Sequence, residues 1–132
     1  SAKYVLIHDG ARPLVTEDIV RDALHGAALY KCAAPAVPVT DTVKEADHNT
    51  VVRTLDRSAL AAIQTPQAFV PEIIKAALTH AIAEKKENTD DCAAVEAMGL
   101  KVHLTKGSNE NIKITGPVDL PTAAAILQAR GE

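Results

Sequence analysis

At 132 residues, of which 47% are hydrophobic, the chain can form one domain, or part of one, with a sizeable core. Trp is absent and only Tyr4, Tyr30 and Phe69 are aromatic, so that core must be packed from aliphatic side chains. The formal net charge of −3 provides no basic surface for nucleic acid, and no apolar run is long enough to span a membrane, so we expect neither partner.

The cysteines and the amino-terminal sequence bear on the compartment. Cys32 and Cys92 are too few for a disulfide framework or a zinc site. We therefore expect two reduced, buried thiols, and with no recognisable signal peptide we expect a cytoplasmic protein.

The first predicted strand, residues 4–7, is an apolar run that breaks abruptly into the polar segment 8–13, HDGARP. Open α/β sheets bind ligands at the carboxyl ends of their strands. This position predicts that Asp9 contacts a metal or a hydroxyl group and that Arg12 contacts the phosphate of a phosphorylated substrate. Local pairing of Asp9 with Arg12 to close the loop explains the spacing equally well. His8 at the strand end is a candidate general base, although a packed, hydrogen-bonded histidine is the commoner case.

The next elements are a helix over residues 16–29, capped by Thr16, and a strand over 32–39 that contains two prolines. Residues 40–56 are different in character, because they alternate polar with apolar residues around the turn-forming segment 47–49. We expect a β-hairpin with too little apolar surface to be stable alone, which packs against a second subunit.

The second half of the chain continues the alternation of helices and strands. In order we predict a short helical turn over 59–63 capped by Ser58, an extended segment over 64–69, helices over 71–83 and over 89–99 (the second capped by Thr89), strands over 100–105 and 111–115, and a last helix over 117–127. This alternation predicts an α/β three-layer sandwich with a mostly parallel sheet. The hairpin is the one piece that does not fit the layered pattern.

Other charged residues have two interpretations each. Asp90 and Asp91 suit a metal, but acids in the first turn of a helix are more often capping residues, which is the interpretation we favour. Lys113 is either a solvent-facing lysine or a phosphate contact at a strand end, and Arg57 is either a surface ion pair or part of the site. No nucleophile–base pair or Gly-rich phosphate loop is present. The residues alone therefore indicate an α/β fold with an anionic-ligand site.

Six ordered blocks carry a family resemblance: HDGARP at 8–13, DTVK at 41–44, TLDR at 54–57, QTPQ at 64–67, TDD at 89–91 and NIKIT at 111–115. Together they closely resemble the C-terminal half of the 2-C-methyl-D-erythritol 4-phosphate cytidylyltransferase family of the non-mevalonate isoprenoid pathway. The resemblance extends over about residues 4–127, nearly the whole chain. It implies that residues 1–132 are the C-terminal portion of a single Rossmann-like nucleotidyltransferase domain.

The resemblance also implies an activity, a cofactor and a set of site residues. The family transfers CMP from CTP to the sugar phosphate, with Mg²⁺, and releases pyrophosphate. The methylerythritol phosphate pocket would be formed by Asp9, Arg12, Thr42, Thr65 and Lys113, and the residues positioning the phosphate for attack would be Arg57 and Lys113. In the family the hairpin is an arm that interlocks two subunits, so Thr42 and Arg57 would serve the partner's site.

One difference from the family is large. The N-terminal half of the family carries a Gly-rich CTP loop and part of the central sheet, and this chain has no counterpart of either. We therefore expect a fragment that is inactive alone. Two other interpretations stay open: a ribitol-5-phosphate cytidylyltransferase, against which Gly10-Ala11 and the TLDR and QTPQ blocks speak, and a non-catalytic α/β binding or dimerisation module.

Overall fold

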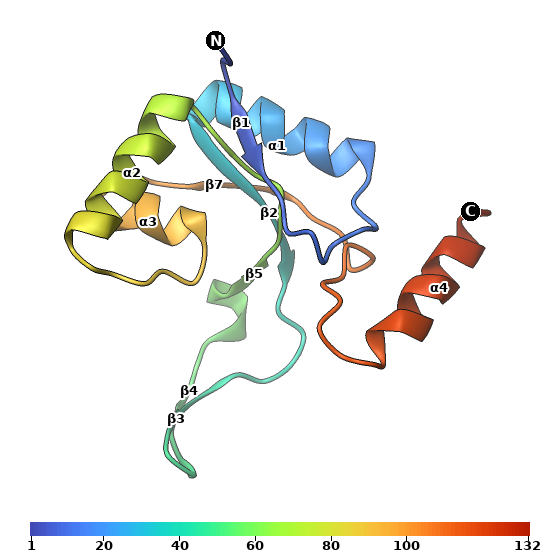
Figure 1. Cartoon of the computed structure of the whole chain (residues 1–132). Coiled ribbons are helices and arrows are strands. Elements are labelled where there is room, and N and C mark those ends of the chain that lie inside the picture. Colours follow the sequence, from blue (N-terminus) through green and yellow to red (C-terminus); the bar gives the residue numbers. More distant parts are fainter.

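A five-stranded sheet forms the middle layer of the fold. In the computed structural model, which describes residues 1–132, the sheet consists of β1 (Val5–Ile7), β2 (Cys32–Pro38), β5 (Ala61–Ile63), β6 (Gln67–Phe69) and β7 (His103–Lys106). The central strand is β2, which pairs with β6 near its start, with β5 near its end, and with β7 along its other edge. β1 pairs with the far side of β6 (Figure 1).

The direction of the strands corrects one prediction. The α/β class and the sandwich are confirmed, but the sheet is not mostly parallel, because only β2 and β7 pair in parallel. The pairs β1–β6, β2–β5 and β2–β6 are all antiparallel. The reason is the hairpin, which reverses the chain after β2 so that β5 and β6 return alongside it. Of the strands after β2 in this sheet, only β7, which follows the helices after β6, runs in the direction of β2.

Helix α1 (Glu17–Tyr30) covers one face of the sheet, as predicted from its apolar spacing. Thr16 caps it, because its hydroxyl oxygen accepts a hydrogen bond from the backbone N–H of Ile19 at 3.4 Å. The buried side of α1 is built from small residues, so the helix lies very close to the sheet. A Cβ at Gly26 would come within 2.6 Å of the Cβ of Ala33, and for this reason glycine is required there.

Helices α2 (Pro71–Ala83) and α3 (Asp91–Ala97) pack together on the opposite face. They enclose the main core, whose buried members are Cys32, Ala34, Phe69, Ile74, Ala77, Ala81, Cys92, Ala94 and Val95. Both cysteines are free and buried, as predicted, and burial raises the pKa of each thiol. The core is aliphatic apart from Phe69, as the composition requires.

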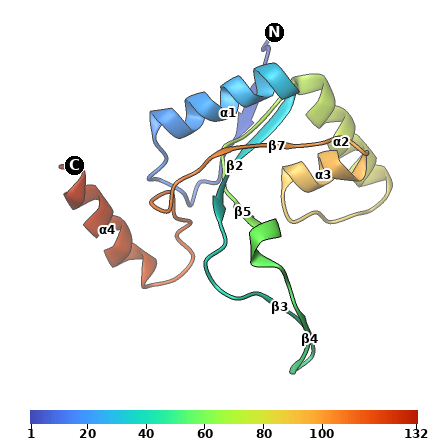
Figure 2. The ribbon, with the colours of Figure 1, turned by 180° about the vertical axis from the view of Figure 1, so that it is seen from behind.

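The predicted hairpin forms a separate two-stranded sheet of β3 (Lys44–Asp47) and β4 (Thr50–Thr54). It projects away from the sandwich in both views (Figures 1 and 2), and every residue of its two strands is exposed. Val51 and Val52 are 56% and 58% exposed, so their apolar surface has no cover within the chain. We call this hairpin, residues 40–56, the arm.

Two local predictions after the arm are wrong. The predicted helical turn over 59–63 is instead a short 3₁₀ turn, Arg57–Ala59, followed by strand β5. The cap of this turn is the side chain of Asp56, not Ser58, since Asp56 accepts the hydrogen bond from the Ser58 backbone N–H.

The carboxyl-terminal part of the chain differs from the prediction in one segment. Residues 111–115 form no strand, and the backbone N–H of Ile114 bonds instead to the carbonyl of Ala11, in the loop after β1, at 2.8 Å. Helix α4 (Asp119–Ala129) stands beside the sandwich (Figure 2) and buries only Ala123. No helix of the chain has the length and apolarity that a membrane span requires.

Candidate functional site

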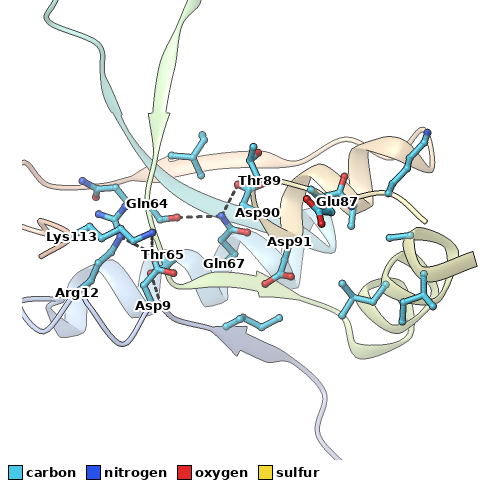
Figure 3. A pocket seen from close by; sticks show the side chains of 18 of the residues that line it. Asp9, Arg12, Gln64, Thr65, Gln67, Glu87, Thr89, Asp90, Asp91 and Lys113 are labelled. Atoms are coloured by element: carbon cyan, nitrogen blue, oxygen red, sulfur yellow. Dashed lines mark hydrogen bonds and ion pairs between the residues drawn. The ribbon is translucent and has the colours of Figure 1, made fainter. Parts of the chain in front are cut away.

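A cavity of about 1050 Å³ opens beyond the carboxyl end of β1, where the sequence predicted a site. Of the predicted site residues, Asp9, Arg12, Thr65 and Lys113 line this cavity. Figure 3 shows their side chains gathered at one end, with the acidic residues of the α2–α3 connection at the other end. The structure therefore brings together residues that are far apart in the sequence.

Asp9 and Arg12 hold each other in place. The loop between them closes as a turn in which the N–H of Arg12 bonds to the carbonyl of Asp9 at 3.1 Å. The guanidinium Nε of Arg12 donates to Oδ2 of Asp9 at 3.1 Å, and its Nη1 donates to the carbonyl of Asn111 at 2.7 Å. The side chain of Arg12 is only 12% exposed, so its direction is fixed. The local pairing that the spacing allowed is thus real.

Thr65 joins the end of β1 to the segment before β6. Its hydroxyl oxygen accepts a hydrogen bond from the N–H of Asp9 at 3.0 Å and lies 2.8 Å from Nδ1 of His8. The other ring nitrogen of His8, Nε2, lies 2.8 Å from the carbonyl of Arg12. A carbonyl only accepts, so Nε2 carries the hydrogen, and in the neutral ring Nδ1 accepts from the Thr65 hydroxyl. Both nitrogens of His8 are occupied although the residue is exposed, so His8 is hydrogen-bonded but not packed, and neither nitrogen is free to act as a general base.

Lys113 supplies a second cation to the same end of the cavity. Its ammonium Nζ lies 3.9 Å from Oδ2 of Asp9, and its side chain is 50% exposed. Arg12 and Lys113 therefore approach one carboxylate from two directions, and one positive charge remains uncompensated among these three groups. This excess of positive charge beside a polar cavity suits a phosphate group.

The cavity lining also includes the segment from α2 to α3, which carries the acidic residues Glu87, Asp90 and Asp91 and the cations Lys85 and Lys86. Asp90 caps α3, since its Oδ1 accepts the backbone N–H of Ala93 at 2.8 Å; the expected cap, Thr89, is one residue too early. Asp91 lies in the first turn, and burial together with the negative charges of Asp90 and Asp9 raises its pKa. The capping interpretation of this acidic pair is confirmed at Asp90. Nowhere in the chain do three or more His, Cys, Asp or Glu side chains cluster in a way that could hold a metal ion.

Three buried amides belong to the site's surroundings and were not predicted from the sequence. Gln67 is 3% exposed and bridges to α3, donating to Oδ2 of Asp90 at 2.9 Å and accepting from the N–H of Cys92 at 3.0 Å. Gln64 and Asn111 are 7% and 0% exposed and bond to each other. The two glutamines belong to the QTPQ block, which was the only signal that could have found them.

The remaining predicted residues, Thr42 and Arg57, do not line this cavity. Both are exposed near the base of the arm, and Nη1 of Arg57 donates to the carbonyl of Thr40 at 2.6 Å. Arg57 lines a second, smaller cavity of about 630 Å³ on the arm side of β2. Within one chain, therefore, the predicted set divides into two groups.

The family model described as 2-C-methyl-D-erythritol 4-phosphate cytidylyltransferase matches residues 1–129. The chain belongs to this family. An enzyme of that name from Caldanaerobacter subterraneus subsp. tengcongensis is 52% identical over 127 residues, and one from Bacillus cereus is 44% identical over 128 residues. These matches cover 96% and 97% of the chain but only 56% and 57% of the relatives. The chain thus spans about half the length of the curated relatives it matches.

Solved structures of the same family have this fold. The crystal structure of 2-C-methyl-D-erythritol 4-phosphate cytidylyltransferase from Thermus thermophilus superposes with a TM-score of 0.88 at 35% identity, covering 97% of this chain and 63% of that one. The 4-diphosphocytidyl-2C-methyl-D-erythritol synthase from Anaerococcus prevotii gives 0.87 at 35% identity, with 96% and 59% covered. The partial coverage of the relatives is consistent with an incomplete nucleotidyltransferase domain.

Proposed function

We propose that this chain is the C-terminal half of a cytidylyltransferase that transfers CMP from CTP to 2-C-methyl-D-erythritol 4-phosphate and releases pyrophosphate. In this half lies the sugar-phosphate site. The observation that carries the proposal is the convergence of Asp9, Arg12, Thr65 and Lys113 on one cavity in a chain of this family. A guanidinium and an ammonium beside a hydroxyl and a carboxylate match a phosphorylated polyol, in which the phosphate meets the cations and the hydroxyl groups meet Asp9 and Thr65.

The chain's own residues bind and orient the nucleophile. Arg12 uses its Nε hydrogen for Asp9 and one hydrogen on Nη1 for Asn111, and keeps its further N–H donors for the substrate phosphate. Lys113, which is half exposed, turns toward the same phosphate. A phosphate oxygen of the sugar phosphate then attacks the α-phosphorus of CTP; a new P–O bond forms while the bond to the oxygen of the leaving pyrophosphate breaks. Positioning and neutralisation of charge supply the rate in such a reaction.

This chain provides no set of protein ligands for the magnesium ion that the family implies. Magnesium in phosphoryl-transfer sites is held mainly by substrate phosphates, water and one or two carboxylates, and no cluster of three potential ligands exists here. When bound, the ion would neutralise charge on the nucleotide phosphates. The residues described above bind the sugar phosphate and do not form a metal site, so no step is assigned to the ion.

The arm accounts for Thr42 and Arg57. In a homodimer in which each arm reaches across the partner subunit, Thr42 and Arg57 would complete the partner's sugar-phosphate site. The exposed Val51 and Val52 at the arm support this, since their apolar surface requires cover. Arg57 would then position the substrate phosphate together with the partner's Lys113.

The free, buried cysteines support a cytoplasmic location for the parent enzyme, because reduced thiols are the rule in that compartment. The named relatives are bacterial.

The proposal is tested by titrating 2-C-methyl-D-erythritol 4-phosphate into the 132-residue chain by calorimetry. Each cation contributes a charge-assisted contact, so R12A and K113A should each weaken binding by about tenfold or more. K101A is the matched control, because Lys101 is exposed and lies outside the cavity, and it should bind as the unaltered chain does. Unchanged affinity in both R12A and K113A would refute the assignment.

The same titration decides between the interpretations of the sequence. Ribitol 5-phosphate binding as tightly as the methylerythritol phosphate would favour the other cytidylyltransferase. The chain alone should release no pyrophosphate from CTP in the presence of the sugar phosphate and Mg²⁺. Turnover by this polypeptide would show that the nucleotide half is not needed, contrary to the proposal.

A further inference from the structure

Two neutral amide side chains are buried beside the cavity. Gln64 lies between β5 and β6 and is 7% exposed, and Asn111 lies in the irregular segment after β7 and is 0% exposed. Buried amides are costly unless their hydrogen bonds are made, and every polar atom of this pair except Oδ1 of Asn111 has a partner, so the pair has a specific structural reason.

The pair ties two loops together. Nδ2 of Asn111 donates to Oε1 of Gln64 at 3.3 Å and to the carbonyl of Thr65 at 3.0 Å. Gln64 in turn bonds twice to Ser108, accepting from its N–H at 3.2 Å and donating to its carbonyl at 2.8 Å. At Gly107 a Cβ would come within 2.6 Å of Oε1 of Gln64, so the close approach of the two loops leaves room only for glycine.

The second loop holds the groups that face the phosphate. The main-chain carbonyl of Asn111 accepts the 2.7 Å hydrogen bond from Nη1 of Arg12, and Lys113 follows two residues later. The first loop carries Thr65, whose hydroxyl fixes the backbone of Asp9. Asn111 itself does not line the cavity, so it touches the site only through its neighbours.

We propose that Asn111, anchored by Gln64, is a positioning residue for the sugar-phosphate site. Its side chain fixes the carbonyl that orients the Arg12 guanidinium, and it fixes the backbone from which Lys113 extends. The inference rests on the proposed function, because it needs Arg12 and Lys113 to be phosphate ligands. It assigns the specificity of the site in part to a residue that no substrate contacts.

The test is N111D against the matched control N109D. In N111D an oxygen replaces the NH₂ donor and faces two acceptors, Oε1 of Gln64 and the carbonyl of Thr65, so the anchor is lost at nearly constant volume. Asn109 is exposed in the same loop and makes no side-chain hydrogen bond, and its substitution changes the net charge equally. Binding of 2-C-methyl-D-erythritol 4-phosphate should weaken about tenfold or more in N111D and less than about twofold in N109D.

A double-mutant cycle distinguishes positioning from general loosening of the fold. If Asn111 acts through Arg12 or Lys113, adding N111D to R12A or to K113A should weaken binding much less than N111D does alone. Losses that multiply in both double variants would show that Asn111 acts independently of the two cations and would overturn the inference. Circular dichroism and amide spectra identify the folded variants, and if N111D does not fold, N111S against N109S replaces it with the same expected difference.

The outcomes separate the inference from the proposed function. If R12A and K113A bind as the unaltered chain does, the proposed function itself is wrong. If they lose affinity while N111D keeps it, the phosphate site stands and the positioning role of Asn111 is overturned.

Discussion

Gln67 is the residue whose substitution tests most directly how the cavity wall is held. Its amide joins β6 to the first turn of α3: Nε2 donates to Oδ2 of Asp90 at 2.9 Å, and Oε1 accepts from the N–H of Cys92 at 3.0 Å. In Q67E an oxygen takes the place of Nε2 and faces the Asp90 carboxylate. The acceptor for the Cys92 N–H is kept, so the change affects the Asp90 side of the bridge and the longer hydrogen bond, 3.5 Å, from Nε2 to the carbonyl of Gln64.

The expected cost follows from the two effects at that position. A hydrogen bond to a charged group contributes about 1.5–3 kcal/mol, and a buried group left beside a like charge adds a penalty of about 1–3 kcal/mol. The free energy of unfolding at pH 7 should therefore fall by roughly 3–5 kcal/mol, a large share of what a domain of this size possesses. Q128E, on the exposed face of α4, changes the charge equally and should leave the free energy within about 0.5 kcal/mol.

The destabilisation caused by Q67E should depend on pH. Burial and the nearby Asp90 raise the folded-state pKa of the introduced carboxyl above its unfolded value. The unfolded state then binds fewer protons at intermediate pH, so the destabilisation is greatest at neutral pH and shrinks as pH falls through the folded pKa. Urea unfolding of the unaltered chain, Q67E and Q128E at pH 7 and pH 5 measures the difference. A loss below about 1 kcal/mol at pH 7, or a loss that grows on acidification, would refute the reasoning.

Three further predictions concern a helix cap, the loop before α4 and the arm. T16A removes the Thr16 hydroxyl that caps α1 and should lower the free energy of unfolding by about 1 kcal/mol in urea, whereas T79A, exposed within α2, should not. Asp119 accepts hydrogen bonds from the N–H groups of Thr115 and Gly116, which lowers its pKa. The stability that Asp119 contributes is therefore present above its unfolded-state pKa and is lost as pH falls through its folded-state pKa. The urea midpoints of the unaltered chain and D119N should converge below pH ~4. If the arms cross, mixing R57A and K113A subunits of the full-length enzyme should restore about a quarter of the unaltered activity, since about half of the dimers are then heterodimers and each heterodimer has one intact site of two. No recovery would place Arg57 in its own subunit's site.

The helices could be predicted closely because their signals are local. The apolar spacing and the proline at its first position gave 71–83, the bounds of α2, and Thr16 marked the start of α1. The direction of the strands could not be predicted, because it depends on where the arm returns the chain. Segment 111–115 has the alternation of a strand but pairs with neither β1 nor β7, although each has only one partner strand, and Ile114 bonds to the loop at Ala11 instead. Tertiary pairing, which a local pattern does not contain, decided both cases.

The residues of the site also fall into those that the sequence could reveal and those that it could not. Asp9 and Arg12 could be found from their position at the end of a strand, because they lie three residues apart and pair with each other. Thr65 lies 56 positions from Asp9, and only the family resemblance associated the two. Gln64, Gln67 and Asn111 carry no charge and match no catalytic pattern, so apart from their places in the QTPQ and NIKIT blocks nothing in the sequence distinguished them from surface amides. Their burial is what reveals them.

The ion pair between Asp9 and Arg12 does not weigh against phosphate binding. A guanidinium has five N–H donors, and the contacts within the chain use the Nε hydrogen and one on Nη1. The three remaining donors are held in a fixed plane by those two contacts, in a side chain that is 12% exposed. An arginine already oriented in this way loses little rotamer freedom when a phosphate binds. The spacing of Asp9 and Arg12 allowed two interpretations, closure of the loop and binding of a phosphate. The two are compatible, because the ion pair that closes the loop also directs Arg12 toward the cavity.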